Sequence, residues 1–290
     1  MIPYAYFPGC TLRSSGRDYQ RSLRATLRAL EIELVEVRDW TCCGATVAPA
    51  ASRLTSVALP AINLLHAEQQ GFEKLMAPCP GCLSRFKGTN RDLAHDPDLK
   101  TKIDEVMKGS YQGNVKAMHP LEVFLELGLE NIRRRVTKRL SGLRIACYYG
   151  CLLTRPPQVA QFDDVEHPQS MDAVALALGA EPVEWPFKTE CCGATMTLTH
   201  PEMVLQLSNA ILKEAKGAGA DAIAVACPLC QMNLDSRQRQ IEETYHTTYK
   251  IPIFYITQLM GLAFGAYPRE VGIHTLITSP REVLGSVGLM

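Results

Sequence analysis

The five-residue sequence Cys42-Cys43-Gly44-Ala45-Thr46 occurs a second time, without change, at residues 191–195 of this 290-residue chain. The cysteines around it are repeated as well, as Cys-x31-Cys-Cys-x35-Cys-x2-Cys in the first half and Cys-x39-Cys-Cys-x34-Cys-x2-Cys in the second. A repeat of this length is typical of a duplicated domain and not of a solenoid. We predict two similar domains, residues 1–141 and 142–290, which meet just after an amphipathic segment at 121–140.

The composition argues against several classes of protein. The chain has 30 basic and 30 acidic side chains, so it lacks the basic surplus that nucleic-acid-binding proteins usually carry. Hydrophobic residues make up 47% of it, which is enough for buried cores. No apolar run approaches the ~20 residues that span a bilayer, and residues 1–10 lack the layout of a signal peptide. We expect a cytoplasmic protein that does not span a membrane and whose thiols stay reduced.

Short apolar runs alternate with segments of helical periodicity in both halves. Strands are predicted at 4–7, 33–37, 74–77, 144–149, 182–185 and 221–226, and helices at 19–30, 53–69, 81–93, 170–178 and 202–216. This alternation indicates the α/β class, with two duplicated domains built on parallel sheets. Cys10, Cys79, Cys151 and Cys227 each follow a predicted strand. Because parallel sheets bind ligands at the carboxyl ends of their strands, we expect the cysteines to converge at that edge.

Each half of the chain supplies five repeated cysteines: a single residue, an adjacent pair and a Cys-x2-Cys. A structural zinc ion takes four ligands, usually from two Cys-x2-Cys knuckles, so five thiols are one too many. A thioredoxin-like interpretation of Cys-x2-Cys leaves three cysteines of each half unexplained. Thiolates also hold iron–sulfur clusters, and five of them favour a cluster with more ligand positions than a cubane, or one with a bridging thiolate. Zinc, a redox pair and an ordinary cubane with a spare thiol remain the alternatives.

Two local features add to this interpretation. Each Cys-Pro-x-Cys, at 79–82 and 227–230, is expected to open a helix, because proline suits the first helical turn. A helix N-terminus also favours the thiolate form of a cysteine.

The eleventh cysteine, Cys147, has no counterpart in the first half, and we expect it to be a buried strand thiol.

The repeated pattern resembles the two cysteine-rich CCG domains found in the B subunit of heterodisulfide reductase. The similarity extends over nearly the whole chain and includes residues 7–11, 148–156 and 255–263. It implies that each domain holds a non-cubane [4Fe-4S] cluster through five cysteines, and that the disulfide substrate enters between the two clusters. Carried over by position, the catalytic and metal-binding residues are Cys10, Cys42, Cys43, Cys79 and Cys82 for one cluster, and Cys151, Cys191, Cys192, Cys227 and Cys230 for the other.

The resemblance implies an iron–sulfur oxidoreductase, the catalytic subunit of a heterodisulfide reductase or reductase-like complex. Its substrate would be a disulfide such as coenzyme M–coenzyme B, and cleavage to two thiols takes two electrons. The sequence has neither a G-x-G-x-x-G fingerprint after a strand nor a ferredoxin cysteine run, so we expect electrons to come from partners. The family implies a ferredoxin-like C subunit and a flavin-containing A subunit. The alternative is a non-catalytic electron-transfer subunit that passes electrons to quinone or another acceptor.

Three further residues are candidates for contact with the substrate. Arg13 and Arg155 follow the first cysteine of each set, and they would meet an anionic group of a coenzyme-type thiol. The alternative for both is an ordinary surface arginine. His119 precedes a predicted helix and lies either near a cluster or in a purely structural position.

Overall fold

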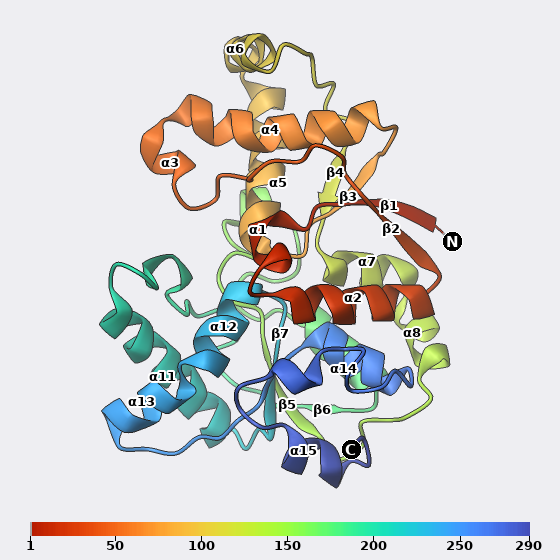
Figure 1. Cartoon of the computed structure of the whole chain (residues 1–290), viewed down its shortest axis with the longest axis vertical. Helices are drawn as coiled ribbons and strands as arrows, with labels where there is room; N and C mark the ends of the chain where they lie inside the picture. Colours follow the sequence, from red (N-terminus) through yellow and green to blue (C-terminus); the bar gives the residue numbers. More distant parts are fainter. Residues whose placement is uncertain (1) are drawn as a thin grey trace.

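The computed structural model describes residues 2–290 and contains two four-stranded parallel sheets, one in each half of the chain (Figure 1). The first sheet has the order β2-β1-β3-β4, with β1 at Ile2–Tyr6, β2 at Ile32–Glu36, β3 at Lys74–Met76 and β4 at Lys116–Met118. The second has the order β6-β5-β7-β8, with β5 at Arg144–Tyr148, β6 at Glu181–Pro182, β7 at Ala222–Val225 and β8 at Ile253–Tyr255. The matching strand orders confirm the predicted α/β class and the duplication.

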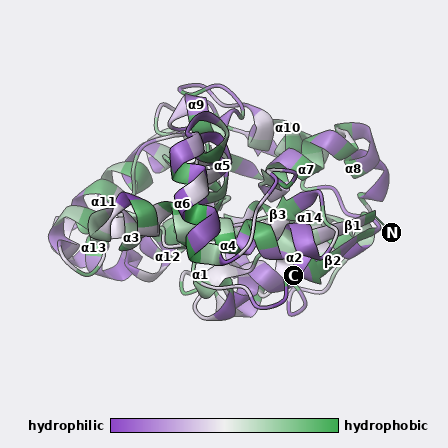
Figure 2. Cartoon of the chain, turned by 90° about the horizontal axis from the view of Figure 1, so that it is seen from above, coloured by the Kyte–Doolittle hydropathy of each residue, from purple (hydrophilic) through white to green (hydrophobic). Residues whose placement is uncertain are grey.

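Helices cover the two sheets. Those of the first half are α1 (Gly9–Arg13), α2 (Arg17–Ala29), α3 (Ala48–Ala51), α4 (Arg53–Gln69), α5 (Pro80–His95), α6 (Pro97–Met107), α7 (Pro120–Leu127) and α8 (Leu129–Arg135). Those of the second half are α9 (Pro157–Ala160), α10 (Ser170–Ala177), α11 (Pro201–Gly217), α12 (Pro228–Ser236), α13 (Gln238–Tyr245), α14 (Ile256–Ala263) and α15 (Arg281–Ser286). Seen from above, the outer helices show hydrophilic and hydrophobic turns side by side, as expected for helices with one buried face (Figure 2). Within residues 2–290, no helix combines the length and the apolar character that crossing a membrane requires.

Most of the predicted elements lie within a few residues of their predicted bounds, and the differences have physical reasons. The amphipathic segment at 121–140 forms two helices, α7 and α8, because Gly128 adopts a φ of 85° and ends the first of them. Strands β4 and β8 were not predicted, since their three residues are too few to show an alternating pattern; β3 and β6 are no longer than these, but a repeated cysteine motif follows each of them. The domain boundary at 141–142 falls between β4 and β5 and stays a prediction.

The two halves pack against each other through α2 and α14, which lie side by side (Figure 1). The rings of Tyr19 and Tyr255 stack with their centroids 4.2 Å apart and an interplanar angle of 5°. The hydroxyls of Ser22 and Thr257 are hydrogen-bonded at 2.7 Å, and Thr26 Oγ1 donates to the carbonyl of Thr257 at 2.9 Å. These buried polar contacts allow one relative orientation of the two halves and so fix how their strand ends face each other.

Close packing around α14 gives a first prediction. At Gly261 a Cβ atom would lie 2.5 Å from Cγ1 of the buried Val271. We expect G261A to lower the free energy of unfolding by about 1–3 kcal/mol, because an overpacked core must shift its backbone or side chains. Thermal denaturation followed by circular dichroism measures this, with G285A as the control because no atom lies within 4 Å of a Cβ there. Equal melting temperatures for the two variants would contradict the prediction.

Candidate functional site

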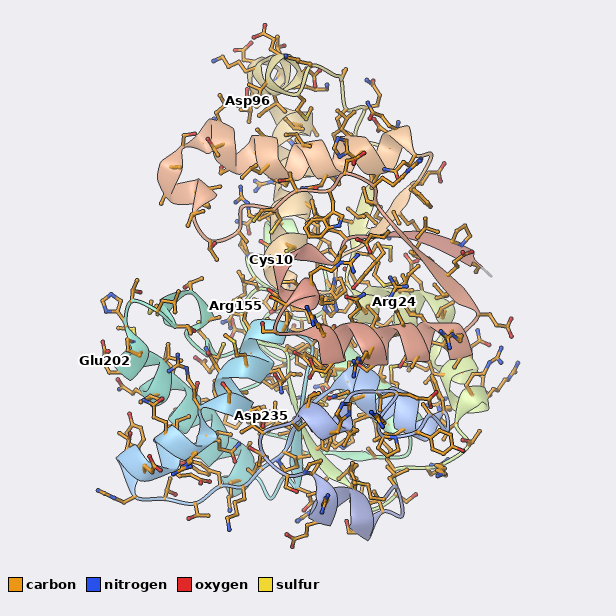
Figure 3. All side chains as sticks on the ribbon, viewed as in Figure 1. Cys10, Arg24, Asp96, Arg155, Glu202 and Asp235 are labelled. Carbon is orange, nitrogen blue, oxygen red and sulfur yellow. The ribbon has the colours of Figure 1, made fainter. Side chains whose placement is uncertain are left out.

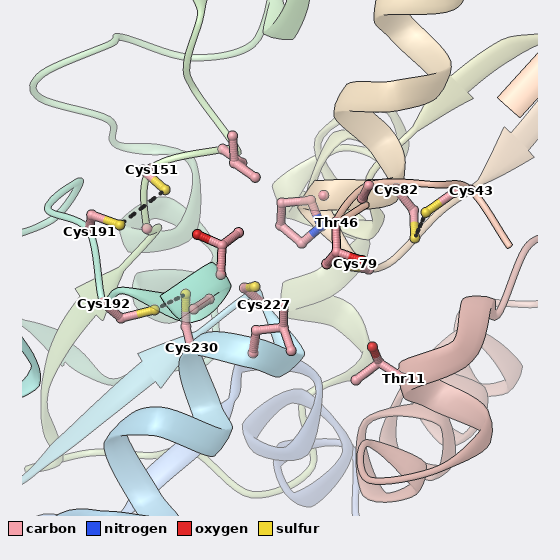
Figure 4. Close-up of a pocket in the computed structure, with 18 of the residues that line it drawn as sticks. Thr11, Cys43, Thr46, Cys79, Cys82, Cys151, Cys191, Cys192, Cys227 and Cys230 are labelled. Carbon is pink, nitrogen blue, oxygen red and sulfur yellow. Dashed lines mark hydrogen bonds between the residues drawn. The ribbon is translucent and has the colours of Figure 1, made fainter. Parts of the chain in front are cut away.

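A cavity of about 260 Å³ lies where the two halves meet, and cysteines from both halves line it (Figure 4). All ten repeated cysteines take part: Cys10, Cys42, Cys43, Cys79, Cys82, Cys151, Cys191, Cys192, Cys227 and Cys230. Most of the other lining residues are small or apolar, among them Gly81, Leu152 and Leu229. The strand-end argument predicts that the cysteines of each half gather at the carboxyl edge of its sheet, and the two edges together bring five sulfur atoms from each half to one space.

The first half positions its cysteines with the segments that follow three strands. Cys10 lies in α1, just after β1, and Cys42 and Cys43 lie in the loop that follows β2. Cys79 is the N-cap residue of α5, which follows β3, and Cys82 lies in the first turn of that helix. Proline at the first position of α5 has the φ angle that a helix requires and no amide hydrogen to leave unsatisfied. The prediction that this Cys-Pro-x-Cys opens a helix is confirmed.

The second half repeats this arrangement. Cys151 follows β5, and the pair at 191–192 lies in the loop after β6. Cys227 is the N-cap residue of α12 after β7, and Cys230 lies in that helix. Figure 3 labels Cys10 near the level where the upper and lower halves meet, and the cavity that both sets line lies at this junction.

Three pairs of sulfur atoms lie close together within the two sets. The Sγ atoms are 2.9 Å apart in Cys43 and Cys82, 3.5 Å in Cys192 and Cys230, and 3.9 Å in Cys151 and Cys191 (Figure 4). Two thiolates on one tetrahedral metal, with bonds of about 2.3 Å, would lie about 3.8 Å apart. The two pairs of the second half already have nearly that spacing, and the pair of the first half is closer.

Equivalent glycines allow the sulfur atoms to approach the backbone. Gly9 and Gly150 directly precede the first cysteine of each set, and both have positive φ angles, of 62° and 69°. A Cβ at Gly9 would lie 3.3 Å from Sγ of Cys82, and one at Gly150 would lie 3.0 Å from Sγ of Cys230. A side chain at either position would therefore crowd the sulfur and strain the backbone. Because glycine has no side chain, space remains beside each Cys-Pro-x-Cys.

Hydrogen bonds between the thiols favour the thiolate form of particular cysteines. The pKa of Cys79 is lowered to about 7 by a hydrogen bond from the Cys82 thiol and, against the opposing effect of burial, by backbone amides at the start of α5. The pKa of Cys191 is lowered to about 6 by a hydrogen bond from the Cys151 thiol and by the amide of Gly193, which lies 3.3 Å from Sγ. Because the thiolate is the form that binds metals, each set has one cysteine prepared for ligation near neutral pH.

The donor set suits iron–sulfur clusters. Ten sulfur atoms around one cavity form an all-thiol set, and thiolates are the usual ligands of such clusters. Within residues 2–290, no three His, Cys, Asp or Glu side chains gather at the spacing that a single bound metal ion requires. The all-thiol donor set, and the space beside the two glycines, fit the binding of iron–sulfur clusters.

A buried polar network supports the second cysteine set. The carbonyl of Lys188 accepts the amides of Tyr149 and Gly150, at 2.8 and 3.2 Å, and so fixes the turn that leads to Cys151. The ammonium group of Lys188 donates to Asp172 at 2.9 Å, and the hydroxyl of Tyr149 donates to the same carboxylate at 2.6 Å. Sequence reasoning misses this network, because a buried lysine–aspartate pair far apart in the chain leaves no local pattern. The two halves differ here, since Pro8 occupies the place of Tyr149 in the first.

His119 is fully buried at the start of α7. Its Nδ1 accepts the amide of Leu121 at 3.2 Å, so Nε2 carries the proton. Nε2 lies 3.0 Å from the carbonyl oxygens of both Pro78 and Ala226, each of which directly precedes a Cys-Pro-x-Cys. Burial lowers the pKa of the ring to about 4, so it is neutral at pH 7. One N–H group therefore joins the two cysteine loops across the junction of the halves.

The three residues expected near the substrate lie outside the cavity lining. Arg13 forms an ion pair with Glu36. Arg155 donates to Glu166 at 2.8 Å and to the hydroxyl of Thr189 at 3.0 Å. Neither arginine, nor His119, is among the described residues that line the cavity. Their contact with a substrate stays a prediction.

Cys147 differs from the other ten cysteines. It lies in β5, is fully buried, and does not line the cavity described above. Burial raises the pKa of its thiol well above the ordinary value, so the thiol stays protonated. Its carbonyl accepts the indole N–H of Trp185 at 3.2 Å. It is a buried strand thiol, as predicted.

Comparison with known proteins identifies relatives over nearly the full length. The chain is 30% identical, over 282 residues, to the 8-methylmenaquinol:fumarate reductase membrane anchor subunit of Wolinella succinogenes, covering 96% of this chain and 98% of the relative. It is 30% identical, over 294 residues, to the B subunit of the ferredoxin/F(420)H(2)-dependent CoB-CoM heterodisulfide reductase of Methanosarcina acetivorans, covering 99% and 97%.

A solved structure of a hypothetical protein from Helicobacter pylori has the same fold, with a TM-score of 0.76 at 12% sequence identity. The match covers 96% of this chain and 52% of that one, so the chain spans about half of that protein. The family model described as a cysteine-rich domain, CCG, matches residues 4–87 and 145–235, which include both cysteine sets. The chain therefore belongs to the family of proteins with tandem cysteine-rich CCG domains, which includes the B subunit of heterodisulfide reductase.

Proposed function

We propose that this chain is the disulfide-cleaving subunit of a heterodisulfide reductase or reductase-like complex. The observation that carries the proposal is the cavity lined by five cysteines from each half. Two Methanosarcina relatives, each named as the B subunit of a heterodisulfide reductase, support it. Each set of five would hold one [4Fe-4S] cluster, and each cluster would be non-cubane, because five thiolates exceed the four that a cubane takes.

The proposed reaction is R–S–S–R′ + 2 e⁻ + 2 H⁺ → R–SH + R′–SH, with the protons taken from solvent. When bound, the two clusters would supply the two electrons from the two sides of the cavity. The chain itself holds two sets of thiols on opposite walls, as Figure 4 shows for Cys82 and Cys192. Leu152 and Leu229, which also line the cavity, place apolar surface beside the sulfur atoms.

The names of the relatives also suggest the substrate, and the resemblance to the family suggests the partners. A mixed disulfide of the coenzyme M–coenzyme B type is the substrate class we propose, since the Methanosarcina relatives are named for it. The electrons would reach this chain from a ferredoxin-like C subunit and a flavin-containing A subunit of the same complex. The apolar lining of the cavity suits the hydrocarbon part of such a substrate. It would bury that part when the disulfide enters the cavity.

Anaerobic purification followed by metal analysis tests this proposal. We expect about eight irons and no stoichiometric zinc per chain, which corresponds to two four-iron clusters. We also expect electron paramagnetic resonance signals from the clusters, and oxidation of dithionite-reduced methyl viologen that depends on the coenzyme M–coenzyme B disulfide. Zinc in place of iron would overturn the proposal. Iron-loaded protein that leaves this and simpler disulfides uncleaved would overturn the catalytic role.

A second candidate function is favoured by the Wolinella relative, which is named as the membrane anchor subunit of a fumarate reductase that uses 8-methylmenaquinol. The same ten cysteines would then hold clusters that only pass electrons to or from a quinone. A water-soluble menaquinone analogue distinguishes the two functions. The second function predicts that the analogue, and not a disulfide, reoxidises the reduced clusters of the purified protein.

A further inference from the structure

We infer that a groove beside the first cysteine set is the docking site of an acidic electron-donating protein, an inference that rests on the proposed function. We call it the arginine groove. It has a volume of about 460 Å³ and is lined by Leu12, Arg13, Arg17, Gln20, Arg21 and Arg24. Among these described lining residues none is acidic, although the whole chain has no net charge. A surface rich in carboxylates is the complement of this groove.

Three of the four arginines of the groove, Arg17, Arg21 and Arg24, belong to one face of α2, and Arg13 lies at the end of α1. Together with Arg28, which lies beyond the groove lining, these three recur every three or four residues along α2, so they project from one side of the helix. The opposite side buries Tyr19, Leu23 and Leu27 in the core. The core side thus holds the helix rigidly while its arginines face outward, with Arg17 and Arg21 exposed. Figure 3 labels Arg24 on this helix.

Little within the protein neutralises this face. Of the four arginines in the groove, Arg13 alone enters an ion pair within residues 2–290, with Glu36. Arg17 Nε donates to a backbone carbonyl at 3.2 Å, and the guanidinium of Arg24 lies 5.3 Å from the centre of an aromatic ring. Guanidinium groups form paired hydrogen bonds with carboxylates, so those of Arg17 and Arg21 are suited to an acidic protein surface.

The arginine groove borders the cysteine cavity. Helix α1 has only five residues; Cys10 and Thr11 line the cavity, and the next two, Leu12 and Arg13, line the groove. Cys10 is itself exposed at the surface. A protein docked in the groove would therefore lie beside Cys10, an exposed cysteine of the first set.

The observations favour a protein over a lipid membrane as the acidic partner. A helix that binds a bilayer carries large apolar side chains beside its basic face, which enter the acyl region. Among the exposed large apolar side chains of the described chain, none belongs to residues 9–29. The electron balance also suits a protein donor: each reduced iron–sulfur cluster gives one electron and is left oxidised, so a donor with two clusters, or two dockings of a donor with one, supplies the two electrons of one disulfide cleavage.

The test uses a charge-reversal pair, R17E/R21E, and a matched control, R133E/R134E. The control makes the same charge change on α8, where both arginines are exposed. The probe is an acidic ferredoxin with two [4Fe-4S] clusters. We expect R17E/R21E to bind it about 10-fold more weakly at low salt and to lose ferredoxin-driven disulfide turnover in proportion, with viologen-driven turnover unchanged. We expect the control to change the affinity no more than about twofold.

Two results would overturn the inference. One is an equal loss of affinity in both variants, which would indicate a diffuse electrostatic effect. The other is ferredoxin binding that R17E/R21E leaves unchanged while binding to phosphatidylglycerol vesicles is lost, which would indicate a membrane site. Affinity is measured without a disulfide, so a failure of the proposed function does not affect this result. R17Q/R21Q, which only removes the charges, is expected to give an intermediate loss.

Discussion

Replacement of Cys191 and Cys192 by alanine is expected to lower the iron content from about eight to about four atoms per chain. It is also expected to reduce viologen-driven disulfide turnover about 100-fold or more, since changes around a metal site cost 10–100-fold even when the ligands themselves remain. Both sulfurs line the cavity, and they lie 3.9 and 3.5 Å from the sulfurs of Cys151 and Cys230. Their removal leaves three thiols in the set, fewer than the four that a cubane takes.

The expected loss of turnover follows from the two-electron chemistry. With one set disabled, the disulfide would meet an electron source on one wall of the cavity only, and one electron does not complete the cleavage. C147A is the matched control, because Cys147 is also a buried cysteine of the second half but does not line the cavity. It should keep both iron and turnover. Full turnover by the C191A/C192A variant with half the iron would show that paired clusters are not needed.

Replacing the equivalent pair of cysteines in the first half tests the role of paired clusters independently. Cys42 and Cys43 occupy the equivalent loop, and replacing both by alanine should leave the iron of the second set in place. Comparing the paramagnetic resonance spectra of the two variants assigns one signal to each half. If both variants lose all of the iron, the ten cysteines form one joint site instead of two.

Sequence was sufficient for the parts of the site that local chemistry determines. An exact repeat around Cys42 and Cys43 predicts the duplication, and the order of strands and helices predicts parallel sheets. From these two, the convergence of the cysteines within each half follows, because parallel strands place their carboxyl ends at one edge and helices begin there at Cys79 and Cys227. That the two sets face each other across one cavity was expected from the family resemblance only, because the contacts that orient the halves leave no pattern in the sequence.

The parts that sequence did not predict depend on contacts between distant segments. The pairing of Lys188 with Asp172, and the stacking of Tyr19 on Tyr255, exist only once the sheets and halves are assembled. The same holds for the arginine groove, whose side chains have the sequence pattern of an ordinary solvated helix face. The groove lies beside the exposed Cys10 because of the way α1 and α2 pack, and the sequence alone does not show this packing.

The second large effect is expected at His119. H119N should lower the free energy of unfolding by about 2–4 kcal/mol at pH 7.5, because it withdraws a donor that two buried carbonyls share and leaves a small cavity; the carbonyl of Ala226 then keeps only a long hydrogen bond, of 3.4 Å, from the hydroxyl of Tyr19. Asparagine is chosen because its carbonyl oxygen preserves the N-cap interaction with Leu121. Any loss therefore reports on the contacts to Pro78 and Ala226 and not on the start of α7. Denaturant unfolding of both proteins, under anaerobic conditions and with equal iron content, measures the difference.

The pH dependence of stability distinguishes the loss of the His119 hydrogen bonds from a simple loss of packing. The pKa of the ring is about 4 in the folded protein and about 6.5 when unfolded, so below pH 6.5 the unfolded chain binds a proton that the folded chain does not. Stability from His119 is complete above pH 6.5 and is lost as the pH falls towards 4. Between pH 7.5 and 5.5 the wild-type protein should lose about 1 kcal/mol more than H119N, which narrows the gap between them. A gap that stays constant would mean that His119 acts only by filling space.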